Sequence, residues 1–163
     1  MMVCEEILQV GDAAAERGRD GDGQGFSVRI APRYCDAQGM LHASRYYELF
    51  EDAFLAWLDH ACGGYLALQA TGGDLVIVEN GCTYRHPARQ NDRVTIDVDP
   101  VWASRSSFCV AFRVRRDQVE IADGRSTYVF VQNGASAPIP AALLDTALAD
   151  AKAQSPRRPA REP

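Results

Sequence analysis

The sequence is poor in the features that mark several common classes of protein. Its 163 residues contain only three histidines, and 22 acidic residues outnumber 17 basic ones, for a formal net charge of -5. Nucleic acids and anionic membranes call for a basic surface, so neither is an expected partner. No apolar run approaches the about 20 residues that a membrane-spanning helix requires.

Motifs for several kinds of catalysis are also missing. There is no G-x-S-x-G nucleophile elbow, no glycine-rich phosphate loop and no pair of histidines at metal-ligand spacing. No cofactor or metal is therefore expected. The five cysteines are scattered and lack a C-x-x-C pair, which indicates neither a disulfide framework nor a zinc site and favours a cytoplasmic protein.

The length and the 47% hydrophobic content predict one domain with a sizeable core. We expect a flexible leader over residues 1–25, the domain over 26–150 and a disordered tail over 151–163, because the two ends are polar or rich in proline and charge.

The hydrophobic periodicity predicts an α+β fold. A strand over 26–30 is followed by a long helix that begins near residues 42–44 and buries one face, which consists of Tyr46, Phe50, Ala53, Trp57 and Ala61. Strands follow over 75–84, 94–98 and 108–115, with Gly81 as the expected place for a bulge or a close backbone approach. Asp123-Gly124 predicts a hairpin turn between strands over 119–121 and 126–131, and residues 141–152 a short helix. Together these elements predict an antiparallel sheet curled around one helix.

The loop before the long helix carries the strongest chemical signal. Asp36 and Gly39 lie just ahead of the predicted helix N-terminus, where unpaired amides and the helix dipole favour negative charge. A carboxylate could there attack or accept a proton, while amides near residues 40–43 hold a carbonyl oxygen. The same pattern also suits an Asx turn in which Gly39 supplies a positive φ, and spacing does not separate the two interpretations.

Residues 34–39 (YCDAQG), 42–47 (HASRYY), 84–92 (YRHPARQND) and 138–140 (PIP) together resemble hot-dog-fold acyl-CoA thioesterases of the 4-hydroxybenzoyl-CoA thioesterase type. Asp36, Gly39 and Tyr46 match the spacing of that signature, and the similarity covers about residues 26–148. One departure is Ala43, because many members have Asn or His at that position, and the histidine here is His42.

The resemblance implies a hot-dog fold of about five strands wrapped around the helix, in a homodimer or homotetramer. It implies hydrolysis of acyl-CoA or acyl-carrier-protein thioesters, with Asp36 as nucleophile or general base and with roles for Gly39 and His42. The alternatives are a dehydratase or hydratase, which would pair His42 with Asp36, and a non-catalytic acyl-thioester-binding domain.

Several further residues are candidates for substrate binding. Tyr46, Tyr47 and Phe50, with Phe54, favour an aromatic or medium acyl chain over acetyl, although core packing explains them equally well. By resemblance, a partner subunit's strand faces the helix end, where Glu79, Asn80 and Thr83 could add polar groups. Seven arginines against three acids over residues 85–116, a balance of +4, could bind carrier phosphates; Arg89 and Arg105 lie in predicted loops and are preferred.

Overall fold

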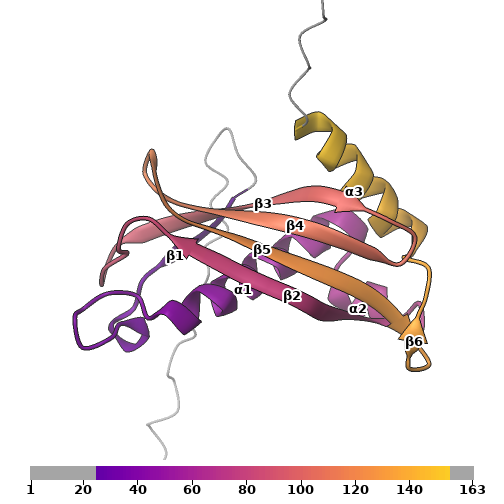
Figure 1. The fold of residues 1–163 in the computed structure, drawn as a ribbon, viewed down its shortest axis with the longest axis horizontal. Coiled ribbons are helices and arrows are strands. Elements are labelled where there is room, and N and C mark those ends of the chain that lie inside the picture. Colours follow the sequence, from indigo (N-terminus) through magenta and orange to yellow (C-terminus); the bar gives the residue numbers. More distant parts are fainter. Residues whose placement is uncertain (1–24, 155–163) are drawn as a thin grey trace, which may run out of the picture.

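A curved antiparallel sheet and one long helix make up most of the structure, which is a computed structural model describing residues 25–154 (Figure 1). Along the chain the elements are β1 (Phe26–Arg29), η1 (Pro32–Tyr34), α1 (Ala43–Cys62), α2 (Tyr65–Gln69), β2 (Asp74–Tyr84), β3 (Arg93–Ala103), β4 (Ser107–Arg116), β5 (Val119–Gln132), β6 (Ala135–Ser136) and α3 (Ala141–Gln154). The predicted α+β class and the predicted start of the long helix are confirmed. The predicted leader and most of the predicted tail lie outside the described residues.

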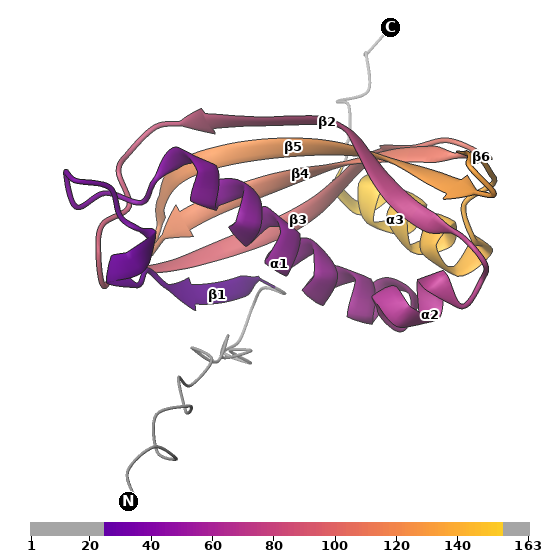
Figure 2. The same ribbon diagram turned by 90° about the horizontal axis from the view of Figure 1, so that it is seen from below.

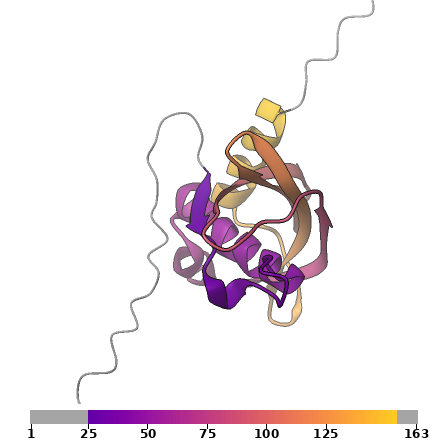
Figure 3. The same cartoon turned by 90° about the vertical axis from the view of Figure 1, so that its left-hand side faces the viewer.

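The sheet has the strand order β1-β3-β4-β5-β2, and each neighbouring pair is antiparallel. The short β6 pairs with β5. The strands curl, and α1 runs along the concave side of the sheet (Figures 2 and 3). Within residues 25–154, every helix is too short or too polar to cross a membrane.

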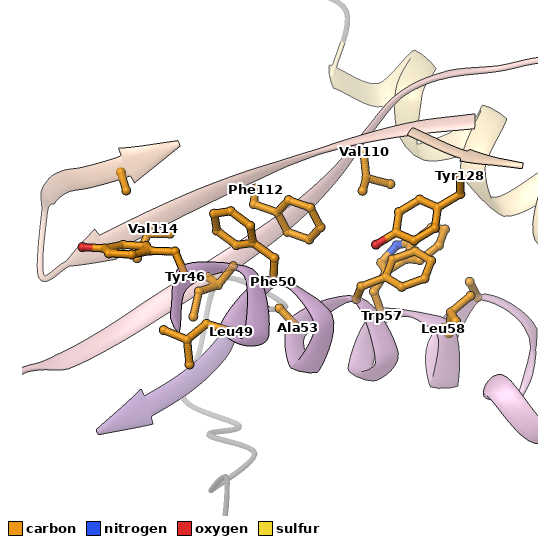
Figure 4. Close-up of a cluster of buried hydrophobic side chains, with 14 of the residues drawn as sticks. Tyr46, Leu49, Phe50, Ala53, Trp57, Leu58, Val110, Phe112, Val114 and Tyr128 are labelled. Atoms are coloured by element: carbon orange, nitrogen blue, oxygen red, sulfur yellow. The ribbon is translucent and has the colours of Figure 1, made fainter. Parts of the chain in front are cut away.

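One face of α1 is buried against the sheet, as its periodicity predicted (Figure 4). The Phe50 ring stacks on Phe112 with 4.6 Å between centroids, and Phe54 stacks on Tyr128 at 4.2 Å. The helix ends at Gly63, whose φ of 82° is a conformation that glycine adopts without strain. These aromatic contacts fix the rotation of α1, and with it the direction of its N-terminus.

The C-terminal helix α3 packs beside α1 and β3. The indole Nε1 of Trp57 donates to Asp150 Oδ2 at 3.3 Å, and the Thr146 hydroxyl donates to the Ala61 carbonyl at 3.1 Å. The strand β1 pairs only with the first part of β3, from Arg93 to Ile96. Figure 1 shows α3 beside the remaining part of β3. The side of the sheet formed by β1 and β3 is therefore covered along most of its length.

The predicted hairpin at Asp123-Gly124 is wrong. β5 passes through both residues without a break, and the turn between β4 and β5 lies earlier, where Asp117 has a φ of 54°. A Cβ atom at Gly124 would lie 2.3 Å from Cε2 of the Phe50 ring. This glycine is therefore explained by the close approach of α1 to the strand.

The predicted bulge at Gly81 is also misplaced. The register between β2 and β5 shifts between Ile77 and Glu79, which leaves Val78 as the extra residue. A one-residue insertion exchanges the faces to which all later side chains of a strand point. The position of the bulge therefore decides which residues of β2 can reach α1.

After the bulge, alternate residues of β2 share a face with Gly124 of β5, the glycine that contacts α1. These residues are Asn80, Cys82 and Tyr84, which pair with Ser126, Gly124 and Ala122. Their neighbours Glu79 and Thr83 pair with Thr127 and Asp123, so they point to the convex face. The concave face at the end of β2 is thus lined by an amide, a thiol and a phenol.

Candidate active site

The loop between η1 and α1 is a small closed structure built around Asp36. The Asp36 amide donates to the Met40 carbonyl at 2.8 Å, and the Gly39 amide donates to the Asp36 carbonyl at 3.0 Å. The carboxylate oxygen Oδ1 accepts from the amides of Gln38, at 2.8 Å, and Met40, at 3.1 Å. Gly39 has a φ of 72°, so the Asx-turn interpretation of this segment describes its geometry correctly.

This arrangement leaves one oxygen of Asp36 available. Within residues 25–154, no hydrogen bond is formed by Oδ2, whereas Oδ1 is held by two amides. The side chain is half-buried, so it is fixed in direction and still reachable. A turn that holds a carboxylate by one oxygen presents the other oxygen to a substrate or a water molecule.

The start of α1 satisfies most of its own free amides. His42 is the N-cap: its Nδ1 accepts from the Ser44 amide at 3.2 Å, and its carbonyl accepts from the Arg45 amide at 2.9 Å. Because Nδ1 is an acceptor, the neutral ring carries its proton on Nε2. The position of His42 is therefore that of a helix cap, and its predicted catalytic role could only involve Nε2.

The predicted group of oxyanion donors is reduced to one amide. The Met40 amide binds Asp36, the Leu41 amide donates to the Ala88 carbonyl at 2.8 Å, and the His42 amide donates to the Tyr34 carbonyl at 2.9 Å. Only the amide of Ala43, the first residue of α1, has no acceptor among the described residues. An unpaired N–H at a helix N-terminus suits a carbonyl oxygen that gains negative charge.

The end of β2 contacts this first turn of α1. The Tyr84 hydroxyl donates to the Ala43 carbonyl at 3.2 Å, and its ring packs edge-on against Tyr46, with 5.0 Å between centroids. Burial raises the pKa of Cys82, on the same face, to about 11. A thiol with such a pKa is protonated near neutral pH and a poor nucleophile.

The predicted substrate-binding residues on α1 differ in their exposure. Tyr46 and Phe50 are buried in the core of the single chain, with 2% of each exposed, and Phe54 is equally buried. Tyr47 is 36% exposed and lies with its ring edge-on to Phe50. Of these aromatic residues, Tyr47 has the surface that a ligand could contact, whereas the others pack inside the protein.

Two of the predicted residues on β2, Glu79 and Thr83, do not point toward α1 within the chain. Glu79 accepts a hydrogen bond from the Thr127 hydroxyl on the convex face, and Thr83 lies on that same face. The sequence had suggested both through the resemblance as residues of a partner subunit's strand, and that role stays a prediction. Asn80 lies on the concave face, where its side-chain oxygen accepts from Ser126.

The arginine-rich stretch is largely neutralised by its own acids. Side-chain ion pairs join Arg85 to Glu120 and Asp123, Arg113 to Asp99, Arg115 to Asp97 and Arg116 to Asp92. Neither Arg89 nor Arg105 has a side-chain ion pair within the described part of the chain. These two are therefore the members of the predicted cluster that have charge to offer a ligand.

Arg89 and Arg105 lie far apart in one chain. Arg89 forms an isolated bridge with Met40, so it borders the Asp36 loop. Arg105 lies in the turn after β3, whose 11 residues span about 33 Å from the end that carries Arg93. No group of three or more potential metal ligands occurs in residues 25–154.

Comparisons with known proteins place this loop and sheet in a family. The family model of the thioesterase-like superfamily matches residues 30–146, which include the Asp36 loop, α1 and the four strands β2 to β5, and which begin just after β1. The chain belongs to the thioesterase-like superfamily. Its curled sheet of five strands with one long helix is the hot-dog fold that the sequence predicted.

Individual relatives of this thioesterase-like protein are distant. A protein of Aquifex aeolicus (strain VF5) named "Putative esterase" is 26% identical over 110 residues, 68% of this chain and 86% of the relative. A solved gentisyl-coenzyme A thioesterase has a TM-score of 0.69 at 21% identity and covers 76% of this chain and 98% of its own. A 1,4-dihydroxy-2-naphthoyl-CoA thioesterase from Synechocystis has a TM-score of 0.70 at 18% identity, covering 78% and 96%.

Sequence reasoning did not single out two side chains beside this loop, the Cys82 thiol and the Tyr84 phenol, whereas the Ala43 amide lies within the range of donors that it predicted. Tyr84 was noted only as the end of a predicted strand and the first residue of a motif. A strand model with its bulge at Val78 would have placed Cys82 and Tyr84 on the face toward α1. No local pattern in the sequence marks that position, because the run of Val76, Ile77 and Val78 is uniformly apolar.

Proposed function

We propose that this protein hydrolyses acyl thioesters, with Asp36 as nucleophile or general base and the Ala43 amide as donor to the thioester oxygen. The observation that carries the proposal is the loop geometry: two amides hold one oxygen of Asp36, and the other oxygen is free beside a helix N-terminus. Membership of the thioesterase-like superfamily supports it. Within that superfamily, we assign the chain to the 4-hydroxybenzoyl-CoA thioesterase type on the residues of its loop signature.

The chemistry of a thioester needs little more than this pair of groups. As a general base, Asp36 takes a proton from water, the hydroxide attacks the carbonyl carbon, and the C–S bond breaks to release a thiolate that is then protonated. As a nucleophile, Asp36 attacks the carbonyl carbon, the C–S bond breaks to release the thiolate, which is then protonated, and the resulting anhydride is cleaved by water. In both routes negative charge develops on the carbonyl oxygen, where the Ala43 N–H can stabilise it.

Thiol release from a panel of acyl-CoAs tests the activity, and Asp36→Asn tests the residue. The substitution keeps the size of the side chain and removes its charge, so we expect hydrolysis to fall at least about 100-fold. Asp145→Asn in α3, an exposed carboxylate far from the loop in sequence, is the matched control and keeps full activity. A folded Asp36→Asn protein with wild-type turnover would refute the assignment.

Isotope labelling identifies the nucleophilic route when water cleaves the anhydride at the carboxyl carbon of Asp36. A single turnover in ¹⁸O-water places the label in the released acid if Asp36 acts as a general base. If Asp36 is the nucleophile and water attacks its carboxyl carbon, the label appears in Asp36, where mass spectrometry of the corresponding peptide detects it. The general-base assignment fails if the peptide is labelled.

For the acyl group, we propose an aromatic or medium-length chain. Tyr47 provides exposed aromatic surface on α1, and the two solved thioesterases compared above are named for aryl-CoA substrates. We expect benzoyl-CoA to be hydrolysed at least about tenfold faster than acetyl-CoA, because burying a ring contributes more binding energy than burying a methyl group. Equal rates on both would contradict this choice.

We also propose that a second copy completes the site. A two-fold pair of β2 strands would run antiparallel, so the end of the second copy that carries Arg105 would lie on the side of the Asp36 loop. Arg89 of one chain and Arg105 of the other could then bind the phosphates of coenzyme A. Light scattering that finds a monomer at micromolar concentration would exclude the shared site.

Carrier recognition has its own test. We expect Arg89→Ala and Arg105→Ala each to raise KM for acyl-CoA by about fivefold or more, with little effect on an acyl thioester of a short thiol that lacks the nucleotide. Arg113→Ala, whose guanidinium already pairs with Asp99, is the control. Equal effects on both substrates would show that these arginines do not contact the carrier.

A further inference from the structure

Tyr84 connects the last residue of the edge strand β2 to the first residue of α1. Its hydroxyl donates to the Ala43 carbonyl at 3.2 Å, and its ring lies edge-on to the buried Tyr46 at 5.0 Å. About half of the Tyr84 side chain is exposed, at 48%, although it contacts two residues of the helix. The contact is therefore at the surface, beside the Asp36 loop.

Ala43 is the residue whose amide is left free for a ligand. The two residues before it are fixed by their amides, because Leu41 donates to the Ala88 carbonyl and His42 donates to the Tyr34 carbonyl. Ala43 itself is held at its carbonyl, which accepts from the Tyr84 hydroxyl. An amide that must meet a developing charge loses much of its effect when it is displaced by about 1 Å.

We propose that Tyr84 is a positioning residue that holds Ala43, and thus its free amide, in a fixed position relative to the edge strand β2. This inference rests on the proposed thioester hydrolysis and adds a residue to it. Tyr84 belongs to the strand that we expect to pair with a second copy. Through its contact with Ala43, the position of the Ala43 amide therefore depends on how well ordered that strand is. Tyr84 acts through Ala43 and does not itself touch the substrate.

The surroundings keep the Tyr84 hydroxyl a donor. Burial, followed by the neighbouring Cys82, raises the pKa of Tyr84 to about 12, and Tyr46 and Tyr47 act in the same direction. Burial raises the pKa of Cys82 to about 11, so that thiol is also neutral near pH 7. The hydrogen bond to Ala43 therefore persists over the whole range in which a thioesterase would be assayed.

The chain offers a matched control at the other end of β2. Tyr65 is also a half-buried phenol, and its hydroxyl donates to the carboxylate of Asp74, the first residue of the strand. Tyr65→Phe and Tyr84→Phe each delete one phenol hydroxyl and one hydrogen bond and keep the ring. They differ in whether the lost bond reaches the helix N-terminus.

The experiment compares the two variants in the full chain. We expect Tyr84→Phe to lower kcat by about 3- to 10-fold, with KM within twofold of wild type and the oligomeric state unchanged, whereas Tyr65→Phe leaves kcat unchanged. Hydrogen exchange of the Tyr46 and Tyr47 amides, in the first two turns of α1, should be faster in Tyr84→Phe only. Melting temperatures show whether both variants are folded.

Each result decides a separate question. Unchanged kcat and unchanged exchange in Tyr84→Phe overturn the positioning role, and so do equal losses of kcat in both variants, which would indicate a general loss of stability. If wild-type protein hydrolyses no thioester, the proposed function fails, while faster exchange in Tyr84→Phe alone still supports the positioning of Ala43.

Discussion

The two edges of the sheet are built in opposite ways. The β1 edge is four residues long, pairs with the start of β3, and gives way to α3 along the rest of that strand. The β2 edge is 11 residues long and carries three consecutive exposed apolar side chains: Val76 at 44%, Ile77 at 41% and Val78 at 61%. One edge is short and covered, and the other is long, apolar and open.

This difference shows which side of the sheet is complete within one chain. Natural sheets protect their edges with short strands, charges or a covering helix, and the β1 side uses the first and last of these. An open apolar edge suits pairing with another strand, and the site we propose lies at the end of that edge. The predictions below test the contrast, beginning with the largest expected effect.

A charge near the middle of β2 should prevent pairing. In a two-fold pair of β2 strands, Val78 lies near its counterpart, so Val78→Asp would place two carboxylates close together in a desolvated interface. We expect self-association to weaken at least about 100-fold, measured by sedimentation velocity over a concentration series. Ser27→Asp on β1 is the control and keeps the wild-type state. If Val78→Asp and Ser27→Asp had the same oligomeric state, the two edges would not differ in their role in self-association.

Added volume on β2 should have a smaller effect. A Cβ atom at Gly81 meets nothing within 4 Å in the chain, so Gly81→Val fits the isolated fold. If a second copy or the substrate occupies that space, the substitution weakens pairing or turnover about tenfold without lowering the stability of the single chain. Ala135→Val on the exposed β6 should change neither. A fully active, paired Gly81→Val protein would show that the space stays empty.

Acid should loosen the start of β2. The hydrogen bond from Tyr65, more than any other cause, lowers the pKa of Asp74 from 3.8. Because the folded pKa lies below the unfolded one, the stabilisation is present above pH 3.8 and is lost as the pH falls through the folded value. We expect Asp74→Asn to be less stable than wild type at pH 7 in chemical denaturation, with the difference shrinking as the pH falls below 3.8. A constant difference would contradict the assignment.

The β1 edge should tolerate change. Arg29 is exposed, and its removal leaves the pairing of β1 with β3 intact. We expect Arg29→Ala to change the free energy of unfolding by less than about 0.5 kcal/mol and to leave association and turnover unaltered. A loss of association would mean that both edges contact another chain.

The sequence predicted those parts of the fold and site that depend on neighbouring residues. The buried face of α1 follows from helical spacing, and the turn at Asp36 and Gly39 follows from local turn chemistry. The error at Gly124 arose because its reason is the Phe50 ring, 74 positions earlier in the chain. A local pattern cannot show a contact of that kind.

The faces of β2 explain why the sequence did not place Cys82 and Tyr84 beside α1. The bulge at Val78 directs both side chains toward the helix, whereas the roles suggested for Glu79 and Thr83 of a partner subunit stay predictions. Only the register with β5 reveals this shift. The ion pairs of the arginine-rich stretch likewise depend on cross-strand register, because Arg115 meets Asp97 only when β3 and β4 are aligned.

The open edge has a consequence for newly made protein. A nascent chain that folds before it meets a second copy exposes β2 to any extended segment nearby, and the waiting time grows as the protein becomes more dilute. The bulge at Val78 interrupts the regular ladder in the middle of this strand, and such interruptions hinder the continuous strand addition that leads to fibres. The same residue that sets the faces of β2 would thus limit aggregation during synthesis.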